Sequence, residues 1–269
     1  MPLRRKYVSA CCSLATVVTL LIAGSAALHV APAHAQTQLG AHTLLKVGEG
    51  DGVNPAMTSP ITTQASGSSL IVFNGGYTGN LTTPSDTYSN AWTQVGIPVF
   101  YNGYSEAFAA TGYVSLAARG GANHTVSIAK PFRSNGEISL PFIEIVNAGV
   151  LHDVAQNYPA SGLTLTSGSV TTTGPAMLVA LWWGDGGVKD MTAVPNNGFT
   201  IIDSFLHLPD NSGVQCAVAV RQVNAAGTYN VTWTDNPSQG AILWLFSFQS
   251  RNNGSDDILV NGFDPASGP

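Results

Sequence analysis

The chain has 269 residues, of which ten are Lys or Arg and fifteen are Asp or Glu, giving a formal net charge of −5. Three of the basic residues, Arg4, Arg5 and Lys6, lie in the first 35 residues, so seven basic and fifteen acidic side chains follow, with a net charge of −8. Nucleic acids and anionic membrane surfaces are bound through Lys and Arg, and this acidic balance excludes both as expected partners.

Residues 1–35 have the order of a secretory signal peptide. The basic start precedes an apolar stretch from about Val8 to Leu28, and the small residues of Ala33-His34-Ala35 suit a signal peptidase. We therefore expect cleavage before Gln36 and export by the general secretion route, since Arg4-Arg5-Lys6-Tyr7 matches a twin-arginine signal only in part. The alternative is a membrane anchor. No later stretch approaches the roughly 20 apolar residues that a spanning helix needs, so no membrane span is expected after cleavage.

Two segments flank the expected domain. Residues 36–63 contain Gly48-Glu-Gly-Asp-Gly52 and two prolines, and form either an extended lead-in or a first edge strand. Residues 250–269 read as a linker followed by a tail of small residues.

Residues 64–249 read as an all-β domain, because short apolar runs alternate with turn residues and no stretch shows a helical apolar period. We expect a two-sheet antiparallel sandwich, of jelly-roll type, with no repeat that indicates a solenoid. Cys216 is the only cysteine after residue 35, so packing must hold the fold without an internal disulfide, and a buried position is expected for it. The expected strands are 69–73, 91–95, 105–109, 112–119, 125–129, 138–146, 164–172, 176–183, 199–205, 214–223, 228–233 and 241–249.

Residues 59–248 resemble an uncharacterised β-sandwich domain of secreted bacterial and phage-related proteins. The resemblance is carried by segments that include Asp86-Thr-Tyr-Ser-Asn-Ala-Trp92, Trp183-Gly-Asp-Gly186 and Gly227-Thr-Tyr-Asn-Val-Thr-Trp233. It implies a fold and supplies no catalytic residue. Separately, Asp257-Ile-Leu-Val-Asn-Gly-Phe-Asp264 resembles the acidic–Ile-Phe-x-x-Gly-Phe-Glu signature that ends some exported Gram-negative proteins, with Leu259 for Phe and Asp264 for Glu. That resemblance implies a secretion or surface-sorting role. The alternative is a last strand tucked onto the domain.

The candidate binding residues are Trp183, Asp185 and Trp92. Adjacent residues of a strand point to opposite faces, so Trp182 and Trp183 cannot fill the same core. Either both are buried in two different layers, or the outer one is covered by a loop, or one is exposed beside the Gly-rich loop that carries Asp185. An exposed aromatic ring beside an acidic or amide group is how proteins stack on sugars, so a glycan is the favoured ligand class.

Several polar residues allow other chemistry. Glu144 lies in an apolar strand on the face of Phe142, where it is part of a structural ion pair, with Arg119 or Arg221, or at an edge position, or else is a general acid. Asp185, Asp190, Asp203 and Asp210 lie near strand ends, where oxygen ligands can hold Ca²⁺, but no EF-hand spacing is present and solvated turn residues are the default. No other cofactor and no other metal site is expected. His124, His152 and His207 are candidate bases, but no GxSxG motif accompanies them.

Three functions follow from these observations. The first is a secreted, non-catalytic binding or surface protein with a glycan ligand. The second is a structural or assembly component of the cell surface. The third is a polysaccharide hydrolase or lyase built on Glu144 with Asp185 or Asp203, since such enzymes need two carboxylates across one bond.

Overall fold

The computed structural model describes residues 36–184 and 187–250, and these residues form strands with two short 3₁₀ turns, η1 (Thr78–Asn80) and η2 (Tyr104–Glu106). All strand pairs are antiparallel, as predicted for an all-β sandwich. The predicted leader 1–35 and tail 251–269 lie outside the described residues.

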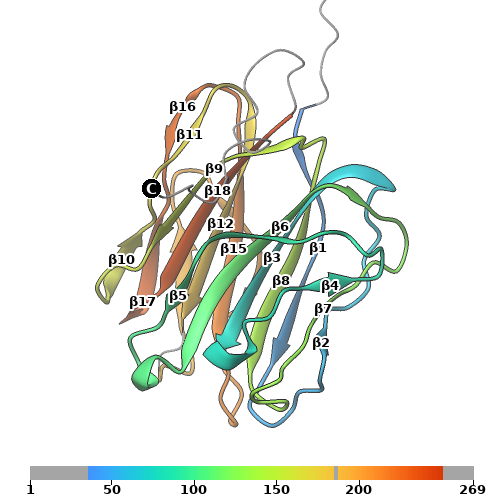
Figure 1. Cartoon of the computed structure of the whole chain (residues 1–269). Helices are drawn as coiled ribbons and strands as arrows, with labels where there is room; N and C mark the ends of the chain where they lie inside the picture. The colour runs from blue at the N-terminus through green and yellow to red at the C-terminus, as the bar shows by residue number, and fades with distance from the viewer. Residues whose placement is uncertain (1–35, 185–186, 251–269) are drawn as a thin grey trace, which may run out of the picture. The chain divides into compact units, whose positions relative to one another are not determined.

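The first large sheet takes all its strands from the first half of the chain. Its order is β1 (Gln38–Val47), β8 (Ile138–Val146), β3 (Ser66–Tyr77), β6 (Phe108–Arg119) and β5 (Thr93–Phe100). The second large sheet takes its strands from the second half. Its order is β14 (Thr200–Phe205), β15 (Gln215–Val223), β12 (Ala176–Gly184), β18 (Ile242–Gln249) and β9 (Val150–Asn157). Figure 1 shows this division by colour, with blue to yellow-green strands in one sheet and yellow to red strands in the other.

Smaller sheets cover the outer face of each large sheet. The first is β2 (Ala56–Met57), β7 (Val126–Ile128) and β4 (Ser85–Asp86), and its counterpart is β10 (Gly162–Thr166), β17 (Thr232–Gln239) and β13 (Thr192–Pro195). A further pair is β11 (Val170–Thr172) and β16 (Gly227–Tyr229). Apolar side chains fill the space between each small sheet and the large sheet beneath it, so the domain has three cores in place of one.

The two halves of the chain share one topology. In each half the first large strand pairs with the fifth, the fifth with the second, the second with the fourth and the fourth with the third. The registers agree as well: Ile71 pairs with Ile143 and Val114, and Val179 pairs with Phe246 and Val220. The jelly-roll type is not confirmed, because a jelly roll shares its strands between two sheets and here each large sheet belongs to one half.

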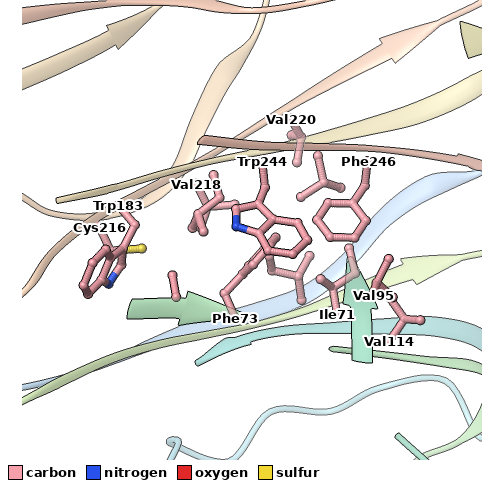
Figure 2. Packing of buried hydrophobic residues seen from close by; sticks show 14 of the residues in the cluster. Ile71, Phe73, Val95, Val114, Trp183, Cys216, Val218, Val220, Trp244 and Phe246 are labelled. Atoms are coloured by element: carbon pink, nitrogen blue, oxygen red, sulfur yellow. The ribbon is translucent and has the colours of Figure 1, made fainter. Parts of the chain in front are cut away.

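The central core lies between the two large sheets. Figure 2 shows Trp244 and Phe246 of β18 packed with Ile71 and Phe73 of β3. Trp244 and Phe246 stack with ring centroids 5.6 Å apart, and Phe73 meets both edge-on. Such aromatic pairs add roughly 0.5–1.5 kcal/mol each beyond the area that they bury. Cys216 lies in this core, as expected, and burial raises the pKa of its thiol.

Most predicted strands are present, and the differences have local reasons. The predicted strand 112–119 is part of the longer strand β6, which begins at Phe108, so that most of the predicted strand 105–109 is instead the turn η2 and the residue after it. The predicted strand 164–172 is interrupted at residues 167–169 into β10 and β11. β1 lies in the segment left open as lead-in or edge strand and is an edge strand of the first sheet, so the sandwich begins before residue 64. The prediction missed β9. This strand lies at a sheet edge, where polar side chains are tolerated, and its His152, Asp153, Gln156 and Asn157 interrupt the apolar alternation that identifies a strand.

Candidate functional site

A pocket of about 430 Å³ lies where three strand connections and the start of the β12–β13 connection meet. The connections follow β5, β9 and β17, and the first two supply Tyr101, Asn102, Tyr158 and Ser161, whereas Ser238 and Gln239 are the last residues of β17 itself. We call this site the tyrosine pocket and define it by Tyr101, Asn102, Tyr158, Ser161, Ser238 and Gln239. Its volume is in the range of about 300–1,000 Å³ that is typical of small-ligand sites.

Two tyrosine rings form the aromatic wall of the pocket. Tyr101 and Tyr158 stack with centroids 5.6 Å apart and planes inclined by 27°, and the Tyr101 and Trp183 rings form a T-shaped pair with centroids 6.2 Å apart. The Tyr101 hydroxyl donates to the Gly240 carbonyl at 3.3 Å, and the Tyr158 hydroxyl accepts from the Asn102 backbone N–H at 3.0 Å. Because both hydroxyls are bonded to backbone groups, the rings are held in place before any ligand arrives.

The polar groups of the tyrosine pocket are uncharged. Among the described residues that line it, the side chains with hydrogen-bonding groups are amides and hydroxyls, with no Asp, Glu, Lys or Arg. Amide and hydroxyl groups donate and accept hydrogen bonds equally well, whereas a charged ligand group needs an opposite charge to repay its desolvation. The pocket therefore suits a neutral ligand with many hydroxyl groups better than an ionic one.

Gln239 adds a hydrogen-bonding group at the base of the pocket. It is 4% exposed, and its side-chain N–H donates to Gln215 Oε1 at 2.9 Å. Its own Oε1 has no hydrogen-bond partner within residues 36–184 and 187–250. A buried acceptor left unpaired costs about 1–3 kcal/mol, so a hydroxyl donor at this end of the pocket would be favoured.

The expectation of an exposed tryptophan is wrong for Trp182 and Trp183, which are both completely buried. β12 is the central strand of its sheet and has a sheet packed on each face, so Trp182 enters the outer core and Trp183 the central core. The two-layer alternative is therefore what the structure has. Trp183 reaches the tyrosine pocket only as the ring beneath Tyr101, and Asp185 lies outside the described residues.

Trp92 is half-buried and has a structural contact. Its indole N–H donates to Asp86 Oδ2 at 2.7 Å, and its ring packs against the core under the first small sheet. Asp86 also accepts from the backbone N–H groups of Tyr88 and Asn90, so it organises the whole 86–92 turn. Trp92 does not line the tyrosine pocket.

Glu144 is buried and bonded, but neither predicted arginine is its partner. Its carboxylate accepts from the backbone N–H of Ala41 at 3.1 Å, from that of Gln64 at 2.7 Å and from the Ser68 hydroxyl at 2.6 Å. The expected ion pair with Arg119 or Arg221 is wrong, because the β-bulge between Leu39 and His42 turns a backbone N–H toward the carboxylate. These bonds give Glu144 a structural role.

The described aspartates do not gather into a calcium site. Asp190, Asp203 and Asp210 pair with His207, His42 and Lys189 respectively, at 2.9, 2.7 and 2.8 Å. Within residues 36–184 and 187–250, no three metal-ligating side chains come together. Each of these carboxylates already has its own cationic or hydrogen-bonding neighbour.

His124 lies between a hydroxyl and a carboxylate, in an arrangement that resembles a catalytic triad. Its Nδ1 is 2.8 Å from Thr63 Oγ1 and its Nε2 is 3.5 Å from Asp86 Oδ1. His124 and the Asp86 side chain are fully buried and Thr63 is 5% exposed, so no substrate can reach the hydroxyl. We assign the three a structural role, joining β7 to the turns at residues 63 and 86. His207 is exposed and paired with Asp190, and His152 lies on the edge strand β9.

No family model, curated protein or solved structure matches this chain. The two resemblances given above therefore stay predictions. Across the described residues, no helix has the length and apolar character to span a membrane.

Sequence reasoning missed Tyr101 and Tyr158, the aromatics that line the tyrosine pocket. Both stand beside turn formers, in Tyr101-Asn-Gly-Tyr104 and in Tyr158-Pro159. An aromatic residue flanked by turn formers lies outside the alternating pattern of a strand, and this is the signal by which the two could have been found.

Proposed function

We propose that this protein is an exported, non-catalytic binding protein that holds a neutral carbohydrate in the tyrosine pocket. The observation that carries the proposal is the combination of a fixed aromatic wall, Tyr101 and Tyr158, with amides and hydroxyls alone as polar partners. A pyranose ring presents an apolar face suited to an aromatic ring, and its hydroxyls suit Asn102, Ser161 and Ser238. The predicted leader 1–35 supports export to a compartment outside the cytoplasm, where carbohydrate ligands of this kind are found.

The hydrolase alternative receives no support from Glu144 and Asp203, the two of its three candidate carboxylates that the structure describes. Glu144 is bonded to backbone N–H groups and Asp203 to His42, and neither lines the tyrosine pocket. The structural-component alternative makes a different prediction: the purified chain would bind no glycan.

A glycan array probed with the purified chain tests the proposal, followed by calorimetry with any neutral oligosaccharide that binds. Tyr158→Ala removes one of the two rings of the aromatic wall and should weaken binding by about 10-fold, which corresponds to about 1.4 kcal/mol. Tyr158→Phe keeps the ring and loses the hydroxyl, so most of the affinity should remain. Phe132→Ala removes a ring that is 67% exposed and lies outside the pocket, and should leave binding unchanged.

Two results would overturn the proposal. One is the absence of binding to every glycan by a chain that folds normally. The other is a glycan affinity that neither Tyr158→Ala nor Asn102→Ala alters, which would move the site elsewhere.

A further inference from the structure

The two large sheets meet along two seams, one on each side of the central core. On one side β1 lies against β14, and on the other β5 lies against β9. Because the two halves share one topology, these seams are equivalent: each joins the first large strand of one half to the third large strand of the other. The side chains that fill the two seams are nevertheless different.

The β1–β14 seam is bridged and the β5–β9 seam is partly open. His42 and Asp203 span the first, with 2.7 Å between Nδ1 and Oδ2. At the second, a cavity of about 410 Å³ is present, which we call the lateral cavity. It is lined by Ala91, Thr93, Gln94, Val95, Val114, Leu116, Leu151, His152, Asp153 and Val154.

The lateral cavity has an apolar floor between two sheet edges. Val95, Val114 and Leu151 are buried beneath it and belong to the central core, whereas Thr93, Gln94 and His152 stand at its rim. β5 and β9 are both edge strands, and an edge strand presents backbone N–H and C=O groups that can pair with another strand. The floor and the edges together suit an extended apolar segment.

A pair of hydrogen bonds joins β5 to β9 at one end of the lateral cavity. Gln156 Oε1 accepts from the backbone N–H of Ile97 at 3.1 Å, and its Nε2 donates to the Ile97 carbonyl at 2.6 Å. The approach depends on Gly96, which adopts a left-handed φ of +68° in the β5 bulge, where a Cβ would lie 2.3 Å from Gln156 Oε1. The cavity is therefore entered from the other end, near Thr93 and Leu151.

The described chain leaves the domain at that open end. Gln249, the last residue of β18, pairs with Val150, which precedes the cavity residues 151–154 of β9. Residues 251–269 follow, and they include the apolar run Ile258-Leu259-Val260 and Phe263. Nine residues of extended chain span about 30 Å, and the cavity portion of β9 is only about 13 Å long at 3.3 Å per residue.

We propose that the C-terminal segment Asp257–Phe263 folds back into the lateral cavity and lies along the edge of β9 as an added strand. Residues at i and i+2 share a face of a strand, so Ile258 and Val260 enter the floor together and Leu259 faces outward. The segment covers apolar surface and pairs backbone groups of the β9 edge. This proposal does not depend on carbohydrate binding.

Hydrogen exchange tests the proposal on the full-length chain and on a chain that ends at Ser250. Ending there keeps every described strand. The Val154 N–H already donates to Asp153 Oδ1 at 2.8 Å. If the segment docks, truncation should raise exchange at the other β9 amides that do not bond to β18 by at least about 10-fold, which corresponds to about 1.4 kcal/mol of lost protection. The truncated chain should also bind the apolar dye anilinonaphthalene sulfonate, and the full-length chain should not. The double variant Ile258→Asp/Val260→Asp should reproduce both effects, and Asn253→Ala/Ser255→Ala should reproduce neither.

A cross-link identifies the occupant directly. Thr93→Cys with Val260→Cys should form an intramolecular disulfide, since this bond needs Cα atoms within about 7 Å, and Cys216 is buried in the core away from both. Equal exchange in the full-length and truncated chains would overturn the proposal. So would a disulfide that joins two chains, because a second copy would then fill the cavity, or dye binding by the full-length chain, because an external apolar ligand would then have access.

Discussion

His42 on β1 and Asp203 on β14 connect the edges of the two large sheets through a hydrogen bond of 2.7 Å. This hydrogen bond raises the pKa of His42 above its ordinary value of 6.5, against a smaller lowering by burial. For a histidine whose pKa is raised on folding, the stabilisation is complete below the unfolded-state pKa and is lost as pH rises through the folded-state pKa.

We therefore predict that His42→Gln lowers the free energy of unfolding at pH 5.5, by about 1 kcal/mol or less for a partly exposed pair, and has a smaller effect at pH 9. Urea unfolding at the two pH values measures the difference. His207→Gln breaks a pair whose side chains are 78% and 80% exposed and should change little at either pH. If His42→Gln lowers the free energy of unfolding equally at both pH values, the His42–Asp203 ion pair is not the cause of the loss.

Asp235 is predicted to destabilise the fold at high pH. It is fully buried on β17, Trp182 Nε1 donates to its Oδ2 at 3.1 Å, and burial raises its pKa to about 7. Because the folded chain disfavours the ionised form, stability should fall as pH rises from about 4 to about 7 and stay lower above.

Asp235→Asn removes the charge and keeps an acceptor for Trp182. It should raise the free energy of unfolding by about 1–3 kcal/mol at pH 8 and leave it nearly unchanged at pH 4. Thermal or urea unfolding across this pH range measures the effect. Asp235→Ala is the contrasting variant: it leaves the Trp182 N–H unpaired and should be destabilising at pH 4 as well. A free energy of unfolding with the same pH dependence in the wild-type chain and in Asp235→Asn would contradict the prediction.

Gly75 of β3 lies directly against the indole ring of Trp183 on β12. A Cβ at this position would lie 2.1 Å from Trp183 Nε1. Gly75→Ala should therefore overpack the central core and cost about 1–3 kcal/mol in urea unfolding. Gly187→Ala is the control, because a Cβ there meets nothing within 4 Å. Combining Gly75→Ala with Trp183→Leu should cost less than the two single changes added together, and simple additivity would show that the contact is not responsible.

Glu144 is predicted to act in stability alone. Glu144→Ala leaves the N–H groups of Ala41 and Gln64 without their acceptor. Each unpaired donor costs about 1–3 kcal/mol, and water relieves part of this cost, so the free energy of unfolding should fall by about 2–4 kcal/mol. Ser68→Ala removes one donor to the same carboxylate and should lower the free energy of unfolding by less than Glu144→Ala does. A Glu144→Ala protein that unfolds at the wild-type urea concentration would reopen the search for another role for this carboxylate.

The β content was predictable because buried strands carry a period-2 or fully apolar pattern. The predicted bounds of 138–146 coincide with β8, where side chains on both faces are buried. β9 escaped prediction because its polar side chains bond across the seams and to neighbouring turns, as Gln156 does with Ile97. Its bulge at His152 also breaks the alternation that would have identified it.

The tyrosine pocket was not predicted, for a related reason. Trp183 and Tyr101 are both aromatic, and sequence alone favoured the residue that lies next to a Gly-rich loop. The structure buries Trp183 because a second sheet covers its face of β12, and this covering depends on a strand order that local patterns do not contain. The shared topology of the two halves was likewise hidden, since it is expressed in register and strand order, with few identical residues at equivalent positions.

The chain passes between its halves once, at residues 147–149, after every strand of the first large sheet and before every strand of the second. Each half therefore resembles one protomer of a dimer, and the two protomer-like halves are joined by this single covalent connection. Neither protomer alone can cover the apolar face that it contributes to the central core, and an uncovered face of that kind promotes aggregation. Two co-expressed fragments, 36–147 and 148–269, should therefore co-purify as a complex, while either fragment expressed by itself should be insoluble.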